Sequence, residues 1–490
     1  MLPKPKPLLL QQISQGKFLK QAWKLLNTSN EKSSGLSRST MKDYENNLNR
    51  NLKILSNSLS TGKFTFSPVK GVALEKKNKG HRPLMISEIQ DRVVHKALAL
   101  KLEARLSRIY KLKNQCSFAY QKGLSIQDAI IQMVYYYSLG YKFILEADIQ
   151  SFFPSVNNEH LLDDIYKKLS PDISINELLK GSLNQQLGNI EELKQKNIEI
   201  YNDIFASIES GIPQGNALSP LLANVYLSSF DHQMINKKIK MIRYADDFII
   251  MCKSKDEAKA AYNIAIEELE TKLHLKLYPL KEVSLNNEKI SRILNPKEHQ
   301  FSFLSIKFDG EKCTVIDKKI ISLLSKLTDF SSREKLKIYY PNQELGLLQV
   351  LTKFRNAIEG WVAAYSFLEI ESQLLEIDKH INIILYNIFK EFDFSLQSPA
   401  KITTQKSLKV DENRNTILKW NSNKKNGLNP SQRKSTGIPL CINLYKKATD
   451  GMMSFKEIID AKSKGLDVSR KRPLKIRTTK KQYASKDRTS

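Results

Sequence analysis

The sequence lacks long apolar runs and contains few cysteines. No stretch approaches the roughly 20 consecutive apolar residues that a membrane-spanning helix needs, and the first ten residues lack the apolar run of a secretion signal. The four cysteines, Cys116, Cys252, Cys313 and Cys441, are far apart and form no Cys-x-x-Cys pair or Cys/His cluster. Neither a disulfide framework nor a zinc site is indicated. We therefore expect a soluble, cytoplasmic protein with free thiols and no membrane partner.

Acidic residues are scarce relative to basic ones. The 490 residues include 78 Lys and Arg against 51 Asp and Glu, which gives a net charge of +27. Residues 396–490 contain 23 of the basic and 7 of the acidic residues, so the excess is concentrated in one segment. Such an excess indicates a polyanionic partner, most simply a nucleic acid. It does not by itself separate a polymerase from a ribosomal or membrane-surface protein, and a merely solvated tail is the plainer interpretation.

The order of apolar segments predicts an α+β domain with an antiparallel sheet. Residues 62–86 are typical of two short strands joined by a basic turn. The apolar run at 143–147 predicts a buried strand, and a helix is expected to begin at Ser219-Pro220 with the serine as its N-cap. The later expected strands are 241–244, 248–252 and 275–278.

The turn after the strand at 241–244 carries two adjacent carboxylates, in the tetrapeptide Tyr244-Ala-Asp-Asp. Two ionised carboxylates so close together repel one another, and burial increases the free-energy cost of keeping both charged. A divalent cation would remove both costs, and magnesium prefers carboxylate oxygen while leaving positions for phosphate. Asp148, after the strand at 143–147, is the candidate third ligand of a two-metal site that joins a 3′-hydroxyl to an α-phosphate. The alternative is a surface hairpin with a polar turn.

Seven sequence motifs occur in the order that one known family shows. They are Arg82-Pro-Leu-Met-Ile-Ser with Asp91-Arg-Val-Val-His-Lys-Ala-Leu, Ala147-Asp-Ile-Gln-Ser-Phe-Phe-Pro-Ser-Val, Gly211-Ile-Pro-Gln-Gly-Asn-Ala-Leu-Ser-Pro-Leu-Leu-Ala-Asn-Val-Tyr, Arg243-Tyr-Ala-Asp-Asp-Phe, Leu275-Lys-Leu-Tyr-Pro-Leu-Lys, Phe303-Leu-Ser-Ile-Lys-Phe and Arg355-Asn-Ala-Ile-Glu-Gly-Trp-Val-Ala-Ala-Tyr. On these motifs, residues 63–365 resemble the prokaryotic reverse transcriptases, close to those of group II introns, retrons and phage-defence systems.

The resemblance implies a right-hand polymerase fold of the α+β class. Its fingers and its palm, with an antiparallel sheet, would occupy residues 61–320, and a helical thumb would occupy residues 321–395. A helical extension at 1–60 would precede them, and a basic extension at 396–490 would follow and bind RNA or DNA.

The resemblance also implies roles for individual residues. Asp148, Asp246 and Asp247 would hold two magnesium ions, assisted by the backbone carbonyl of Ile149. Phe153 would be the aromatic gate that excludes a ribose 2′-hydroxyl and so selects deoxynucleotides. The remaining assignments are Arg82 on the incoming triphosphate, Gln214 and Gly215 in the nucleotide pocket, and Lys281 beside the leaving pyrophosphate. Outside such motifs, these residue types more often serve as a core aromatic, a turn before a helix, or solvated surface charges.

Three positions depart from the pattern of the family. Asn216 stands where many relatives have glycine or alanine, Glu282 follows Lys281 where threonine is common, and Ser305 replaces the usual glycine of the primer grip. These differences concern the placement of substrate more than the reaction itself.

The function that the resemblance implies is RNA-directed DNA polymerisation with two magnesium ions and deoxynucleotides. Synthesis would start from a 3′-hydroxyl or from a protein hydroxyl in the C-terminal segment. The template would be a structured non-coding RNA, the product DNA, and the setting bacterial antiviral defence, without the Cys/His-rich endonuclease of mobile introns. One alternative is a group II intron maturase that acts in splicing and retrohoming, and another is a basic structural protein of a ribonucleoprotein. The sequence leaves homo-oligomer formation open.

Overall fold

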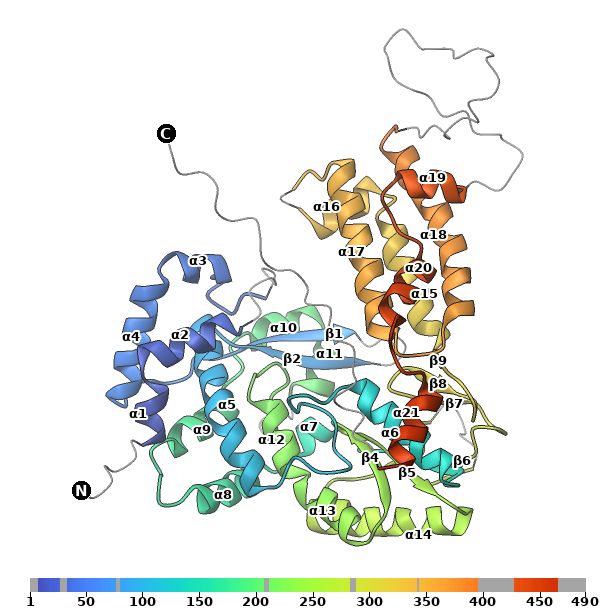
Figure 1. Ribbon diagram of the computed structural model, residues 1–490. Coiled ribbons are helices and arrows are strands. Elements are labelled where there is room, and N and C mark those ends of the chain that lie inside the picture. The colour runs from blue at the N-terminus through green and yellow to red at the C-terminus, as the bar shows by residue number, and fades with distance from the viewer. Residues whose placement is uncertain are drawn as a thin grey trace, which may run out of the picture. The chain divides into compact units, whose positions relative to one another are not determined.

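The computed structural model describes residues 8–26, 33–75, 80–206, 211–282, 288–341, 343–394 and 427–465 (Figure 1). The chain divides into two compact units, residues 1–294 and 295–490. None of the helices in the described ranges combines the length and the apolarity that a membrane crossing requires.

The first unit begins with short helices that pack around a long one. Apolar side chains recur along one face of α4 at Leu52, Leu55 and Leu59, all buried, as expected for an amphipathic helix. The long helix α5 is buried along much of its length. The helices are α1 (Leu9–Ile13), α2 (Gly16–Lys24), α3 (Met41–Asn46), α4 (Leu48–Ser60) and α5 (Ile89–Ile109).

A two-stranded ribbon lies between α4 and α5 in the sequence, and Figure 1 shows it as a pair of long arrows. Its strands β1 (Lys70–Glu75) and β2 (His81–Ile86) are antiparallel, with Leu74 opposite Arg82. The two strands predicted within 62–86 are confirmed.

The four-stranded sheet of the first unit has the order β4-β5-β3-β6, with every pair antiparallel. Its strands are β3 (Phe143–Asp148), β4 (Lys240–Tyr244), β5 (Asp247–Cys252) and β6 (Arg292–Leu294). Residues 248–252 of β5 are all buried, so both faces of this inner strand are covered. The strand predicted at 275–278 is wrong, because only Leu277 forms an isolated bridge, to Ile149, and the fourth strand is β6 instead.

Further α-helices and a π-helix belong to the first unit; α6, α13 and α14 contact the strands of this sheet, and α10 and α11 contact the β1–β2 ribbon. Their bounds are α6 (Ile126–Ser138), α7 (Phe152–Ser155), α8 (Asn158–Leu169), α9 (Asn176–Leu183), α10 (Ile190–Lys196), α11 (Ile198–Ile204), α12 (Ser219–Tyr226), α13 (Ser228–Asn236), α14 (Lys255–Ile266) and the π-helix η1 (Glu267–Lys272). The helix start predicted at Ser219 is confirmed, but Leu218 is the N-cap. The Ser219 hydroxyl instead donates a hydrogen bond to the carbonyl of Pro213.

The second unit joins a small sheet to a helical bundle. Strands β7 (Phe301–Phe303), β8 (Ile306–Phe308) and β9 (Cys313–Val315) form an antiparallel meander. The helices are α15 (Asp317–Asp329), α16 (Arg333–Tyr339), α17 (Leu347–Tyr365), α18 (Glu371–Glu391), α19 (Pro430–Ser435), α20 (Cys441–Thr449) and α21 (Phe455–Ser463). The division into two compact units at residue 294 does not test the predicted domain limits at residues 60, 320 and 395, which stay predictions.

Candidate active site

Strand pairing brings the predicted metal-binding carboxylates to one end of the four-stranded sheet. β3 ends at Asp148 and β5 begins at Asp247, and the register pairs these two residues directly. Paired Cα atoms of antiparallel strands are about 5 Å apart. Asp246 immediately precedes Asp247, in the turn between β4 and β5. All three carboxylates that the sequence singled out therefore lie at the same end of this sheet.

The turn that contains Asp246 has a constrained backbone. Tyr244 and Asp247 pair across β4 and β5, so only Ala245 and Asp246 form the turn itself. Ala245 has φ 62°, in the left-handed region, which costs a residue with a side chain about 1–2 kcal/mol. The surrounding protein must hold this turn in place, and strained turns of this kind cluster at functional sites.

The environment of Asp247 disfavours its charged form. The residue as a whole is exposed, but desolvation of its carboxyl group, followed by the charges of Asp246 and Glu146, raises its pKa from 3.8 to about 6. The guanidinium of Arg82 acts in the opposite direction. A cation at this position would relieve the repulsion of Asp247 by Asp246 and Glu146.

The carboxylate of Asp148 is paired with a lysine. Lys289 forms an ion pair with it, and within the described residues no three His, Cys, Asp or Glu side chains are gathered tightly enough to form a ready metal cluster. The donors nevertheless fit a divalent cation, because Asp148, Asp246 and Asp247 offer hard carboxylate oxygens from a paired strand end and its turn. In this structure the ammonium group of Lys289 provides the positive charge beside Asp148.

Backbone hydrogen bonds fix the stretch that follows Asp148. The carbonyl of Asp148 accepts from the amide of Tyr278 (3.2 Å), and the amide of Gln150 donates to the carbonyl of Lys276 (2.8 Å). Ile149, whose carbonyl is the predicted additional metal ligand, lies between them and is buried. Asp148, at the end of β3, is therefore held by β5 on one side and by residues 276–278 on the other.

The loop at 211–215 is fixed between two other segments that carry predicted site residues. The amide of its second residue donates to the carbonyl of Phe153 (2.8 Å), and the amide of Met85 in β2 donates to the carbonyl of Gln214 (2.8 Å). Gly215 has φ 117°, and a Cβ there would come within 2.6 Å of the Met85 carbonyl oxygen. A side chain at position 215 would therefore be both strained and obstructed.

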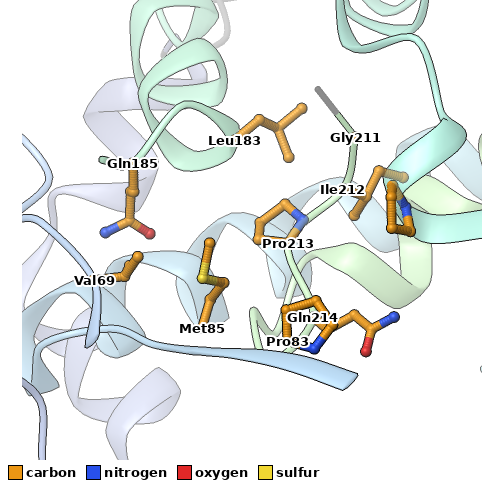
Figure 2. Close-up of a pocket in the computed structure, with 10 residues that line it drawn as sticks. Val69, Pro83, Met85, Leu183, Gln185, Gly211, Ile212, Pro213 and Gln214 are labelled. Atoms are coloured by element: carbon orange, nitrogen blue, oxygen red, sulfur yellow. The ribbon is translucent and has the colours of Figure 1, made fainter. Parts of the chain in front are cut away.

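A small cavity separates these segments, and Figure 2 shows the side chains around it. Its volume is about 30 Å³, which is room for one water molecule rather than a nucleotide. Its lining comes from β2, the loop at 211–214 and neighbouring segments: Val69, Pro83, Met85, Pro154, Leu183, Gln185, Gly211, Ile212, Pro213 and Gln214. The assignment of Gln214 and Gly215 to a nucleotide pocket stays a prediction.

Phe153 lies on the short helix α7, five residues after Asp148. Its ring is partly buried and packs edge-on against the buried Phe152, with centroids 5.3 Å apart. The preceding Ser151 has φ 46°, so the chain turns sharply between β3 and α7. The role of Phe153 as a gate stays a prediction.

The two predicted basic site residues differ in their surroundings. Arg82 is exposed on β2, and its charge acts on the carboxyl of Asp247. Lys281 forms an ion pair with Glu288 at 2.9 Å, and its amide donates to the carbonyl of Ser291. The structure therefore associates Arg82 with the carboxylates and gives Lys281 a different carboxylate partner.

Two residues at the site had no assigned role from the sequence. Glu146 lies two positions before Asp148 on the same strand, so both project to one face, and it forms an ion pair with Arg292 of β6 at 2.7 Å. The two-residue repeat of a β-strand would have identified Glu146 from the sequence, because it places Glu146 on the same face as Asp148. Lys289 has no such signal, because its pairing with Asp148 joins residues 141 positions apart.

Residues 74–308 match the family model described as "Reverse transcriptase (RNA-dependent DNA polymerase)". This part of the chain is therefore a reverse transcriptase domain, and the class indicated by the seven motifs is confirmed.

Curated relatives match over this region. The protein YkfC of Escherichia coli is 23% identical, and the match covers 46% of this chain and 65% of that protein. The group II intron-encoded protein LtrA of Lactococcus lactis is 27% identical, covering 40% of this chain and 30% of that protein. An uncharacterized 91 kDa protein in a cob intron of Schizosaccharomyces pombe is 30% identical, over 37% of this chain and 20% of that protein. The chain thus spans between a fifth and two thirds of the length of these relatives.

Among solved structures, a chain of a partial Cas6-RT-Cas1–Cas2 complex is 27% identical. The match covers 55% of this chain and 43% of that chain, with a TM-score of 0.31.

Proposed function

We propose that the protein is an RNA-directed DNA polymerase that adds deoxynucleotides to a 3′-hydroxyl on an RNA template. The observation that carries the proposal is the pairing of Asp148 with Asp247, beside Asp246, within a reverse transcriptase domain. The three carboxylates offer oxygen ligands for two magnesium ions, which when bound would activate the attacking hydroxyl and neutralise the triphosphate. Arg82 would add positive charge for the triphosphate, and Phe153 would select against the ribose 2′-hydroxyl.

The test is RNA-templated primer extension by the double variant Asp246→Ala, Asp247→Ala. Incorporation should be lost, while binding of the RNA–primer duplex persists. The control variant Glu191→Ala, Glu199→Ala removes two exposed carboxylates from α10 and α11 and should extend the primer as the wild type does. Unchanged synthesis by the Asp246/Asp247 variant would refute the proposed mechanism.

We also propose that the template is a dedicated structured RNA and that synthesis serves antiviral defence in the bacterial cytoplasm. The support is the basic excess of residues 396–490, which lies outside the catalytic unit. Sequencing of the RNA and DNA that copurify with the protein tests this role. A single abundant RNA with complementary DNA is expected, whereas random cellular RNA would contradict it.

A second candidate function is that of an intron maturase. It is favoured by the relatives, since LtrA is a group II intron-encoded protein and the fission yeast relative belongs to a cob intron. This alternative expects the copurified RNA to be an intron that flanks the gene. It also expects splicing of that intron to survive the Asp246→Ala, Asp247→Ala substitutions.

We further propose that DNA synthesis starts on a hydroxyl of the C-terminal segment as an alternative to a nucleic-acid primer. The candidates are Ser469, Thr478, Thr479, Tyr483, Ser485, Thr489 and Ser490, which lie outside the described residues. Intact-mass measurement after nuclease digestion should show protein carrying residual nucleotide. Protein of unmodified mass would exclude priming by the protein.

A further inference from the structure

Arg243 is buried in β4, one residue before the strand ends at Tyr244 and the carboxylate-bearing turn begins. Its side chain is 1% exposed and pairs with the equally buried Asp231 of α13. The pair is bidentate, with Nε donating to Oδ1 at 2.7 Å and Nη2 donating to Oδ2 at 2.5 Å. Burial opposes the charge on Arg243, but Asp231 outweighs it and raises the pKa of the guanidinium. Arg243 is therefore a buried permanent cation.

The remaining donors of Arg243 reach three further parts of the first unit. Nη1 donates to the carbonyl of Ala245 at 2.8 Å and to Oδ1 of Asn224 at 3.2 Å. Nη2 donates to the hydroxyl of Ser117 at 2.9 Å. Asn224 lies on α12, the helix that follows the loop at 211–215. One side chain thus ties the carboxylate turn to α12, to α13 and to the segment around Ser117.

The contact with Ala245 restrains Asp246 directly. The carbonyl of Ala245 and the amide of Asp246 belong to one planar peptide unit, so holding the carbonyl fixes the orientation of that unit. Ala245 is in the left-handed region, a conformation that the turn would leave at little cost if it were not held. Because Asp247 begins β5 opposite Asp148, the turn also fixes where Asp246 lies relative to this pair.

We propose that Arg243, anchored by Asp231, is a positioning residue that holds the Ala245–Asp246 peptide so that the carboxylates of Asp148, Asp246 and Asp247 can share divalent cations. Arg243 touches none of these carboxylates in its hydrogen-bond set, and it acts through the turn. The inference rests on the proposed function, because it assumes that the three carboxylates bind metal.

A purely structural role makes a different prediction. If the Arg243–Asp231 pair only fills the core, its replacement changes the stability of the fold but leaves metal affinity unchanged. Residues that orient metal ligands typically change metal affinity about 10- to 100-fold when replaced. Metal binding therefore separates the two roles.

The first variant is Arg243→Lys, which keeps the charge for Asp231 but cannot span Asp231 and the Ala245 carbonyl together. The electron paramagnetic resonance signal of free Mn²⁺ measures binding of the ion to the protein without nucleic acid. The affinity for Mn²⁺ should fall about 10-fold or more. The magnesium concentration that gives half-maximal incorporation should rise, while the KM for deoxynucleotide stays close to that of the wild type. Ser117→Ala is the matched control, since Ser117 contacts the same guanidinium but not the turn, and it should bind Mn²⁺ normally.

A second variant guards against misfolding of the first. Replacement of a buried ion pair by apolar residues is often neutral or stabilising, so Asp231→Leu combined with Arg243→Met should keep a cooperative fold. It should bind Mn²⁺ as weakly as Arg243→Lys does. Wild-type Mn²⁺ affinity in a folded variant of either kind would overturn the proposal.

The outcome also distinguishes failure of this inference from failure of the proposed function. If the wild type and Asp246→Asn bind Mn²⁺ equally and neither incorporates nucleotide, the carboxylates are not a metal site and the proposed function fails. If the wild type binds Mn²⁺ and Asp246→Asn does not, the metal site on which the proposed function depends is established. A folded Arg243→Lys protein with wild-type affinity then refutes the positioning role alone.

Discussion

At the scale of single residues, the carboxylates of the candidate site are held in a conformation that costs stability. Asp247 is surrounded by Asp246 and Glu146, and its pKa is raised to about 6. Because this value lies above the ordinary 3.8, the unfolded protein releases the proton first as pH rises. Ionisation of Asp247 therefore lowers the free energy of unfolding as pH rises from 3.8 to about 6, and this free energy stays lower above that range.

Asp247→Asn should accordingly raise the melting temperature of metal-free protein at about pH 7.5, with little difference from the wild type near pH 4. Magnesium should narrow the difference at neutral pH, because the cation stabilises only the wild-type carboxylate. Thermal unfolding across this pH range, with and without EDTA, provides the measurement. A variant that is less stable than the wild type at neutral pH in EDTA would contradict this interpretation.

Phe153 makes a prediction about substrate choice. Phe153→Val should increase the use of ribonucleotides relative to deoxynucleotides by about 10- to 100-fold, which is typical of a changed hydrophobic contact in a pocket. Competing single-nucleotide incorporation measures the ratio. Phe152→Leu is the control, since Phe152 is buried beneath Phe153, and it should alter stability but not the ratio.

Much of this residue-level site could be predicted from the sequence, because its signals are local. The carboxylates Asp148, Asp246 and Asp247 were recognisable by their place at the ends of apolar runs, and the strand register pairs Asp148 with Asp247. Arg243 was visible only as part of its motif. Its pairing with Asp231 depends on how α13 packs against β4, and no spacing in the sequence encodes that contact.

At the scale of elements, the β7–β8 hairpin shows why one departure from the family pattern matters. Its two-residue turn places Leu304 at φ 52° and Ser305 at φ 69°. Both residues are in the left-handed region, which residues with side chains adopt at a cost of about 1–2 kcal/mol each. A glycine is therefore the residue that this backbone favours at position 305, in agreement with the family pattern expected from the sequence.

Ser305→Gly should raise the free energy of unfolding by about 1 kcal/mol, because it removes the left-handed penalty. Ser302→Gly is the matched control, as Ser302 lies within β7 and glycine there should destabilise by about 0.5–1 kcal/mol. Urea denaturation measures both variants. Destabilisation by Ser305→Gly would show that the turn does not have the backbone described above.

Element boundaries were harder to predict than element types. The sequence predicted the start of a helix at Ser219 but not its end, and in the structure α12 ends at Tyr226 and α13 starts at Ser228. The strand β6 has only three residues, too few for an alternating pattern to be recognised. It exists because it pairs with β3, from which it is separated by more than 140 residues.

At the scale of the whole molecule, part of the C-terminal segment is built into the second unit. Helix α20 contacts α17 and α18, and the buried Asp378 of α18 accepts hydrogen bonds from the amides of Cys441 and Ile442, at the start of α20. Arg433 pairs with the same aspartate at 2.7 Å. Most of the basic excess of residues 396–490 lies outside the described residues, so its nucleic-acid role stays a prediction.

Arg433→Met should destabilise the second unit by about 3–5 kcal/mol, because it leaves the buried Asp378 without its cation. Lys379→Met is the control on the same helix. It breaks an exposed pair with Glu376, which should cost less than about 1 kcal/mol. Urea denaturation of both variants decides the matter, and equal stabilities would show that the buried pair does not hold α19 and α20 in place.

The most direct measurement is single-nucleotide incorporation on an RNA template by the wild type and by Asp148→Asn. Asp148 lies opposite Asp247, and its replacement removes one of the proposed metal-binding carboxylates while the side chain keeps its size. The wild type should add the deoxynucleotide that is complementary to the template and require magnesium, and Asp148→Asn should bind the duplex but add none. Magnesium-dependent addition by Asp148→Asn at the wild-type rate would contradict the central claim that these three carboxylates carry the polymerase reaction.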